Sequence, residues 1–186
     1  MSRIQTIARW ALRVVILLLT TFWLRASDSV WVAAVEVVGN PAADTEWSLC
    51  TQSRQRYRRE ELQECMRQDS LVLLRWAQEQ GYWFAQVSVG WDSEGARVRY
   101  RIEPGEAVRI AALEVTVFPD TPAGITQRLQ WYTAQAVGYV ASRQQVEELL
   151  DGLLRIAAAA GYPEARADIA EVRLSGPWAE LRAVLY

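Results

Sequence analysis

The chain reads LLRWAQEQGYWFA at Leu73–Ala85 and LLRIAAAAGYPEA at Leu153–Ala165, with the Gly-Tyr pair recurring 80 residues later. A second match joins VAAVEVVG at Val32–Gly39 to IAALEVTV at Ile110–Val117, with an offset of 78 residues. Because the two matches have nearly the same spacing, they indicate an internal duplication. Each copy has about 75 residues, a normal size for a small domain.

The second copy shows the order of elements more clearly. Alternating apolar residues predict a strand at residues 110–117, and apolar residues at helical spacing predict a helix at residues 125–139. A second helix starts after Ser142, with Gln145 as its capping-box partner, and ends at Gly161. Two strands at residues 164–174 and 179–186, with a turn at Ser175–Pro177 between them, complete the order β-α-α-β-β.

The first copy is expected to repeat this order. We expect a strand at residues 32–39, a short helix near Asp44–Thr51 and a long helix at residues 58–80, with Asp69-Ser70 as a possible irregularity. A hairpin follows, with strands at residues 85–91 and 97–103. The predicted fold is α+β, with two tandem domains at residues 30–104 and 105–186, each a three-stranded mixed sheet covered by two helices.

Gly81 and Gly161 are interpreted as left-handed C-caps of the long helices, because glycine has no Cβ to clash there. Tyr82 and Tyr162 would then fill the seam between helix and sheet. Pro104 and Gly105 form the predicted hinge between the two copies. All of these roles are structural.

Residues 1–26 differ from the rest. A basic start with Arg3, Arg9 and Arg13 precedes the uncharged run VVILLLTTFWL at Val14–Leu24. This pattern is typical of a secretory signal peptide, which would leave a mature start near Ser27. A retained membrane anchor is the alternative. Both readings place the remainder outside the cytoplasm.

The composition excludes several functions. The chain has no histidine and a net charge of −2, which argues against histidine-dependent hydrolases and against a nucleic-acid partner. No catalytic residue, metal site or cofactor is predicted. We interpret Glu60, Glu61, Glu147 and Glu148 as a solvated face at helix starts, where acids favour the helix dipole.

The chain has two cysteines, Cys50 and Cys65, and no C-x-x-C motif. An even number in an exported protein favours a disulfide. Two unpaired thiols packed against helices are the alternative.

The arrangement helix-Gly-Tyr-x-x-Ala, hairpin and IEPGEAVRIAALEV (Ile102–Val115) resembles the junction between successive POTRA (polypeptide-transport-associated) domains. The resemblance covers Val32 to Tyr186. Such domains occur in outer-membrane assembly factors of the BamA and TamA type and in two-partner secretion transporters, where a cystine near the first POTRA domain is familiar. The resemblance implies a non-enzymatic, periplasmic protein-binding module in outer-membrane protein assembly or translocation.

The partners that the resemblance implies are unfolded or extended outer-membrane protein segments. A TamB-like inner-membrane-anchored subunit is a further partner, as is a membrane β-barrel where the chain is a fragment of a longer protein. The alternative is a membrane-anchored scaffold like the POTRA-bearing division proteins, which would bind partners and not clients.

The resemblance also implies a binding site, because the second strand of a POTRA sheet lies at the edge and can accept an extended peptide. The expected edge is Gln86, Val87, Ser88, Val89, Gly90 and Trp91, with Trp83 and Phe84 as neighbouring aromatic contacts. The alternatives are an edge that binds nothing and aromatic side chains that only pack. Glu171 and Arg173 are expected to blunt the corresponding edge of the second copy.

Overall fold

The computed structural model describes residues 29–39, 47–118 and 123–186. The predicted signal peptide or anchor at residues 1–26 lies outside these ranges. The described residues form two compact units, the first with residues 29–37, 47–70 and 89–100, and the second with residues 38–39, 71–88, 101–118 and 123–186. Within the described ranges, no helix is long and apolar enough to cross a membrane.

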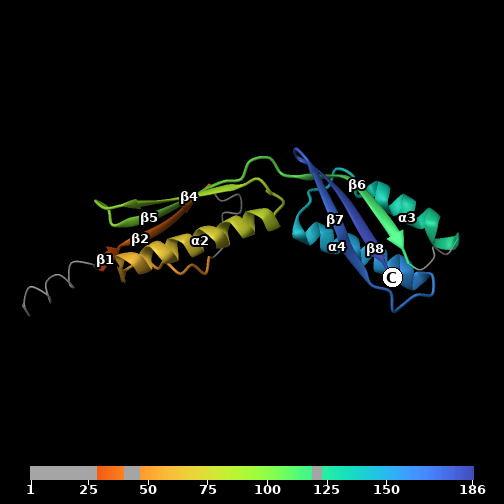
Figure 1. Ribbon diagram of the computed structural model, residues 1–186, viewed down its shortest axis with the longest axis horizontal. Helices are drawn as coiled ribbons and strands as arrows, with labels where there is room; N and C mark the ends of the chain where they lie inside the picture. Colours follow the sequence, from red (N-terminus) through yellow and green to blue (C-terminus); the bar gives the residue numbers. More distant parts are fainter. Residues whose placement is uncertain (1–28, 40–46, 119–122) are drawn as a thin grey trace, which may run out of the picture. The chain divides into compact units, whose positions relative to one another are not determined.

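The second unit contains the complete β-α-α-β-β order that the second copy predicts (Figure 1). The sheet order is β6-β8-β7, with β6 parallel and β7 antiparallel to the central strand β8. Helix α3 contacts β6, and α4 contacts β7 and β8. The elements are β6 (Arg109–Val117), α3 (Ala123–Gln135), α4 (Arg143–Ala159), β7 (Ala167–Ser175) and β8 (Trp178–Leu185).

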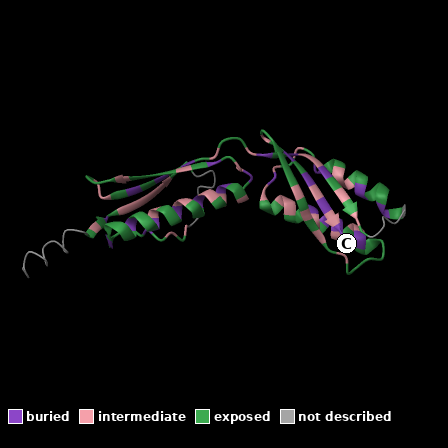
Figure 2. Ribbon diagram, viewed as in Figure 1, coloured by how far each residue is buried: buried purple, intermediate pink, exposed green. Residues whose placement is uncertain are grey.

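The central strand β8 carries the core of this sheet. Its alternate residues Ala179, Leu181, Ala183 and Leu185 are at most 2% exposed, and Figure 2 shows the buried residues alternating along the strand. This is the period-2 pattern of a strand with one face packed against helices. Burying these side chains together with apolar residues of both helices removes apolar surface from water, which is the main force that holds the layers together.

Helix α4 begins and packs as its sequence predicts. The Ser142 Oγ accepts a hydrogen bond from the Gln145 backbone N–H at 3.2 Å, which satisfies a free donor of the first turn. Its buried stripe includes Gly152, where an added Cβ would collide with the ring of Tyr132. The Tyr132 hydroxyl donates to the Leu149 carbonyl at 3.2 Å. Gly152 therefore allows α3 and α4 to approach closely.

A second three-stranded sheet has the order β2-β5-β4. In each three-stranded sheet, the strand that comes last in the sequence therefore lies in the centre. This shared order confirms the predicted duplication. The elements of the first copy are β2 (Ala34–Val38), α2 (Arg59–Glu79), β4 (Gln86–Asp92) and β5 (Arg97–Glu103).

The first copy also differs from the expected pattern. Residues 47–51 are not helical, so the part of the predicted short helix that is described is wrong. The sequence did not predict the two-stranded antiparallel sheet of β1 (Ser29–Val32) and β3 (Gln55–Arg58). Helix α2 runs without a break through Asp69-Ser70, where an irregularity was expected.

Asp69 explains both the continuous helix and the non-helical segment. Its carboxylate is 1% exposed and accepts hydrogen bonds from the Cys50 N–H (2.6 Å), the Thr51 N–H (2.9 Å) and the Tyr100 hydroxyl (2.8 Å). Burial raises the pKa of Tyr100 above its ordinary range, so its hydroxyl keeps the proton that it donates. Cys50 and Cys65 form a disulfide. Asp69 and the disulfide both attach the segment at residues 50–51 to α2.

The two Gly-Tyr turns have the same backbone. Gly81 N–H and Gly161 N–H each donate to the carbonyl three residues earlier, and Tyr82 N–H and Tyr162 N–H each donate to the carbonyl five residues earlier. The two glycines have φ of +92° and +97°, as the predicted left-handed caps require.

The surroundings of the two turns differ. Gly81 is buried under Val140, whereas a Cβ at Gly161 would meet no atom within 4 Å. Tyr82 is half-buried. Tyr162 is 49% exposed, so it does not fill the seam as expected.

We predict that Asp69→Ala lowers the free energy of unfolding by about 3 kcal/mol or more, because it leaves buried donors without an acceptor. Urea unfolding measures the change. Asp92→Ala is the matched control, since Asp92 also accepts from two backbone N–H groups but is exposed, and it should cost about 1 kcal/mol. Equal losses in the two variants would contradict this account of Asp69.

We also predict that Gly81→Ala and Gly161→Ala differ in cost. Both place a Cβ at positive φ, which costs about 1–2 kcal/mol, but only Gly81→Ala forces Val140 to move, which adds about 1–3 kcal/mol. Thermal or urea unfolding of the two variants checks the ranking. A larger loss for Gly161→Ala would show that the second turn is the more tightly covered one.

Candidate functional site

The predicted binding strand is an edge strand. All six predicted residues, Gln86 to Trp91, lie on β4, which stands at the end of the sheet order β2-β5-β4. Val89 is 37% exposed, and the space around a Cβ at Gly90 is open to 4 Å. A peptide backbone would therefore meet no side chain at Gly90. Whether β4 binds a partner stays a prediction.

The two aromatic residues before β4 have different surroundings. Trp83 packs against the core of the second unit, and its Nε1–H donates to the Ala141 carbonyl at 2.9 Å. Phe84 is 53% exposed. Most of the Trp83 side chain is thus used for packing, whereas Phe84 is free to contact a partner.

The second unit has a free edge of its own at β7, next to an apolar groove of ≈ 460 Å³. Ile169 and Val172 of β7 both line this groove, together with Trp83 and with Val146 of α4. Two residues that are three apart normally lie on opposite faces of a strand. Here they share a face because the register with β8 shifts between Ile169 and Glu171, which inserts one extra residue.

The backbone of β7 directs hydrogen-bonding groups to its free side. Arg166 and Tyr186 exchange two hydrogen bonds, of 2.7 and 2.9 Å. In an antiparallel pair, hydrogen-bonded and non-hydrogen-bonded positions alternate. Ala167 and Ile169 therefore direct their N–H and C=O groups away from β8, toward the open edge. Their side chains face the helices, so an added strand would run beside the groove.

Charged residues border the groove on the helical side. Arg143 at the start of α4 forms ion pairs with Glu147 at 2.9 Å and with Glu79 at 3.1 Å. Hydrogen bonds from its guanidinium to Glu147 and Glu79 raise the pKa of Arg143. The groove thus combines an apolar floor with a charged rim in which Arg143 is paired with Glu79 and Glu147.

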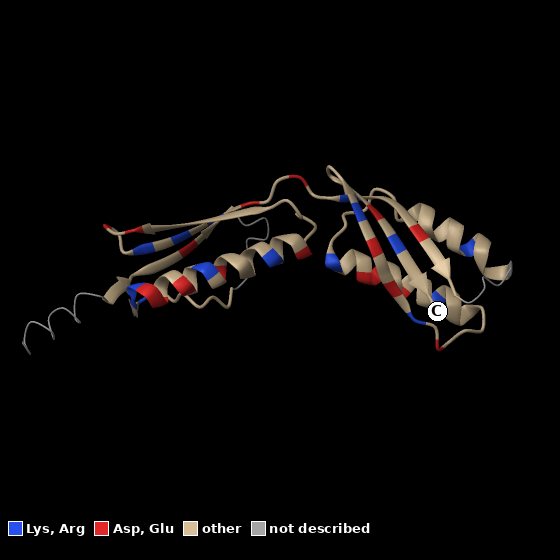
Figure 3. Cartoon of the chain, viewed as in Figure 1, with Lys and Arg blue, Asp and Glu red and all other residues tan. Residues whose placement is uncertain are grey.

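The charges that were expected to blunt β7 lie on the opposite face of the sheet. Glu171 accepts from Arg173 at 2.7 Å and from Arg182 of β8 at 2.9 Å, and Arg182 reaches Glu114 of β6 at 3.4 Å. Figure 3 shows this row of alternating charge across the three strands. The hydrogen bond from Arg173 is the main cause that lowers the pKa of Glu171, against a smaller effect of burial. These charges pair with one another on the solvent face, and the helix-facing side of β7 carries the apolar side chains of Ala167, Ile169 and Val172.

The remaining sequence-predicted residues lie in connections. Pro104 and Gly105 join β5 to β6, and Gly105 has φ +69° with open space around it. The predicted disulfide residues Cys50 and Cys65 lie far along the chain from β7 and contribute nothing to its groove. Sequence reasoning missed the groove because the alternation of apolar residues in β7 gives no sign of the extra residue at Ala170.

No family model matches the chain, and no curated protein matches it. Solved structures do match. BamA POTRA3-5 from Haemophilus influenzae has 12% identity and a TM-score of 0.42, over 85% of this chain and 66% of that one. POTRA1-2 of the periplasmic domain of Omp85 from Anabaena has 17% identity and a TM-score of 0.41, over 83% of this chain and 94% of that one. CdiB from Escherichia coli has 14% identity and a TM-score of 0.40.

The match to CdiB covers 84% of this chain but only 27% of CdiB. The first two of these structures consist of POTRA domains. Since all these TM-scores lie below 0.5, the fold rests on the strand order and register of this chain itself.

Proposed function

We propose that the chain is a non-enzymatic protein-binding module that takes up an extended protein segment by strand addition at the edge of β7. The observation that carries the proposal is the apolar groove of ≈ 460 Å³ directly beside that edge. In this mode the backbone of the edge strand supplies the hydrogen bonds, and pockets for alternate side chains supply the preference for sequence.

The groove supports an extended occupant. A strand paired to β7 would place every second side chain on the helical side of the sheet, beside Ile169, Val172 and Val146. Val172 is 40% exposed and Leu174 is 46% exposed, so the edge offers apolar contacts that no described residue covers. We infer a client with alternating apolar and polar residues, which is the pattern of an outer-membrane protein strand.

The cellular setting rests on the sequence resemblance to POTRA domains. It favours the periplasm, outer-membrane protein assembly or translocation as the process, and unfolded outer-membrane proteins or a TamB-like subunit as partners. The domain bounds at residues 30–104 and 105–186, which rest on the internal duplication, and the binding of a partner at the edge of β4, which the resemblance implies, remain predictions.

The test is fluorescence anisotropy with a labelled synthetic peptide of alternating valine and threonine residues flanked by arginines. We predict that Val172→Glu weakens binding at least tenfold, about 1.4 kcal/mol, because the new carboxylate would be buried in the groove by the peptide. Arg173→Gln is the matched control on the opposite face of the same strand, and it should change affinity less than twofold.

A second pair of variants addresses β4. Val89→Pro removes a backbone N–H from that strand, whereas Val89→Thr keeps it. The proposal expects both variants to bind the peptide as the unchanged chain does. Loss of binding in Val89→Pro alone, with normal binding in Val172→Glu, would overturn the β7 assignment in favour of β4.

A further inference from the structure

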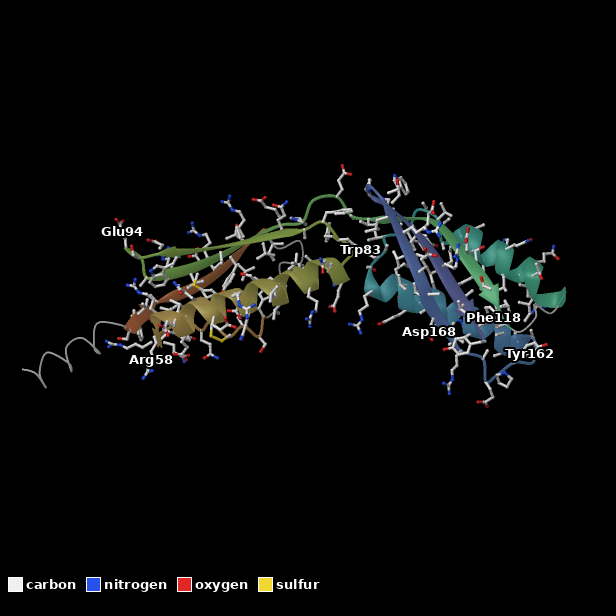
Figure 4. The ribbon with its side chains drawn as sticks, in the orientation of Figure 1. Arg58, Trp83, Glu94, Phe118, Tyr162 and Asp168 are labelled. Carbon is white, nitrogen blue, oxygen red and sulfur yellow. A yellow bond between two sulfur atoms is a disulfide. The ribbon has the colours of Figure 1, made fainter. Side chains whose placement is uncertain are left out.

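The second unit has another apolar hollow, of ≈ 440 Å³, beside the second Gly-Tyr turn. Its walls include Phe118, Tyr162 and Tyr186, which are 59%, 49% and 53% exposed. Figure 4 labels Phe118 and Tyr162 at the same end of the unit. Aromatic side chains gathered around an open hollow are typical of an interaction surface. We call this surface the terminal hollow.

The equivalent surface at the first Gly-Tyr turn is covered within the same unit. The Gly81 carbonyl accepts a hydrogen bond from the Val108 N–H at 2.8 Å. The side chain of Val140 lies over Gly81, and the Trp83 indole donates to Ala141. The structure itself thus shows what kind of segment covers a turn of this geometry.

The covering segment is a small, internally bonded element. The Ala141 N–H donates to the Val108 carbonyl at 2.8 Å, and Ile110 and residues 138–139 exchange two hydrogen bonds of 2.8 Å each. This pairs residues 108–110, at the point where β6 begins, with residues 138–141 before α4. We call the pair the docking element.

The second turn has the groups that would receive such an element. Its backbone hydrogen bonds repeat those of the first turn. The Gly81 carbonyl accepts a hydrogen bond from Val108. Among the described residues, no backbone N–H donates to the equivalent carbonyl of Gly161. Open space lies over Gly161 where Val140 lies over Gly81. The part of the chain that the structure describes therefore provides both an apolar hollow and a carbonyl that no described backbone N–H reaches.

We propose that the terminal hollow binds the docking element of another β-α-α-β-β unit. The incoming unit would donate a backbone N–H to the Gly161 carbonyl and place a branched apolar side chain over Gly161. Its remaining apolar surface would pack on Phe118 and Tyr162. This goes beyond the proposed strand addition, because the occupant is folded and the surface is separate from β7.

The side chains of the hollow are arranged for such contact. The Tyr186 hydroxyl donates to the Asp168 carboxylate at 2.7 Å, which holds the ring at the border of the hollow. Position 163 carries proline where the first turn has Trp83, so an indole-to-carbonyl bond cannot be made there. We expect the aromatic rings of Phe118 and Tyr162 to supply the contact area instead.

Photo-cross-linking in the cells that produce the chain tests the proposal. A benzoylphenylalanine replaces Tyr162 in the full chain, and in a control it replaces Trp131, which is 68% exposed on α3. We expect cross-linked peptides from position 162 to come from the first strand or the turn before the second helix of a β-α-α-β-β unit. Cross-links no stronger than those of the control, or cross-links to extended client segments, would overturn the proposal.

A second measurement does not depend on the partner's identity. A copy of residues 104–186 is attached after Tyr186, because Ile102 and Leu185 are the last buried residues of the equivalent strands β5 and β8. Hydrogen exchange of the amides of Gly161, Tyr162, Glu164 and Ala165 should slow at least tenfold in this extended chain. The slowing should be lost when the residue equivalent to Val108 in the attached copy is changed to arginine. Equal exchange with and without that change would overturn the proposal.

Peptide binding at β7 is measured in parallel with the Tyr162→Glu variant. We expect that variant to lose the docking of another unit at the terminal hollow. Its affinity for the alternating peptide should stay unchanged. The two proposals therefore fail separately, since loss of peptide binding reports on β7 and loss of docking reports on the terminal hollow.

Discussion

The hydrogen bonds that place β8 between β6 and β7 are the constraint on which the second unit depends. Both neighbours pair with β8 over most of its length, so the last strand in sequence is the central strand in space. This leaves β7, which follows the helices, at an edge. The covered face of the sheet, the groove beside α4 and the free backbone of β7 all follow from this order.

The repeated Gly-Tyr turn has one backbone geometry in two different surroundings. The same positive-φ glycine ends a long helix twice and starts the same set of hydrogen bonds twice. At Gly81 the turn is buried against Val140, and at Gly161 it is open. A duplicated sequence therefore produces equal backbones with unequal surroundings, and the difference between them is what identifies a surface available for contact.

Local signals made much of the fold predictable. Ser142 with Gln145, the two Gly-Tyr turns and the hairpin turns mark element ends through short-range chemistry that the sequence displays directly. Long-range contacts were not visible. Asp69 reads as an interruption of α2, yet its carboxylate is satisfied by Cys50, Thr51 and Tyr100, two of which lie 18 or more residues earlier and one 31 residues later.

The groove was hidden for the same reason. The register shift that turns Ile169 and Val172 to one face depends on the pairing of β7 with β8, and a sequence alternation read alone assigns them to opposite faces.

The exchange of the Ala167 and Ile169 amide hydrogens, followed by NMR, tests the central claim most directly. The account predicts fast exchange in the free chain and strong protection when the alternating peptide is bound. Protection confined to the amides of residues 86–92 would contradict it.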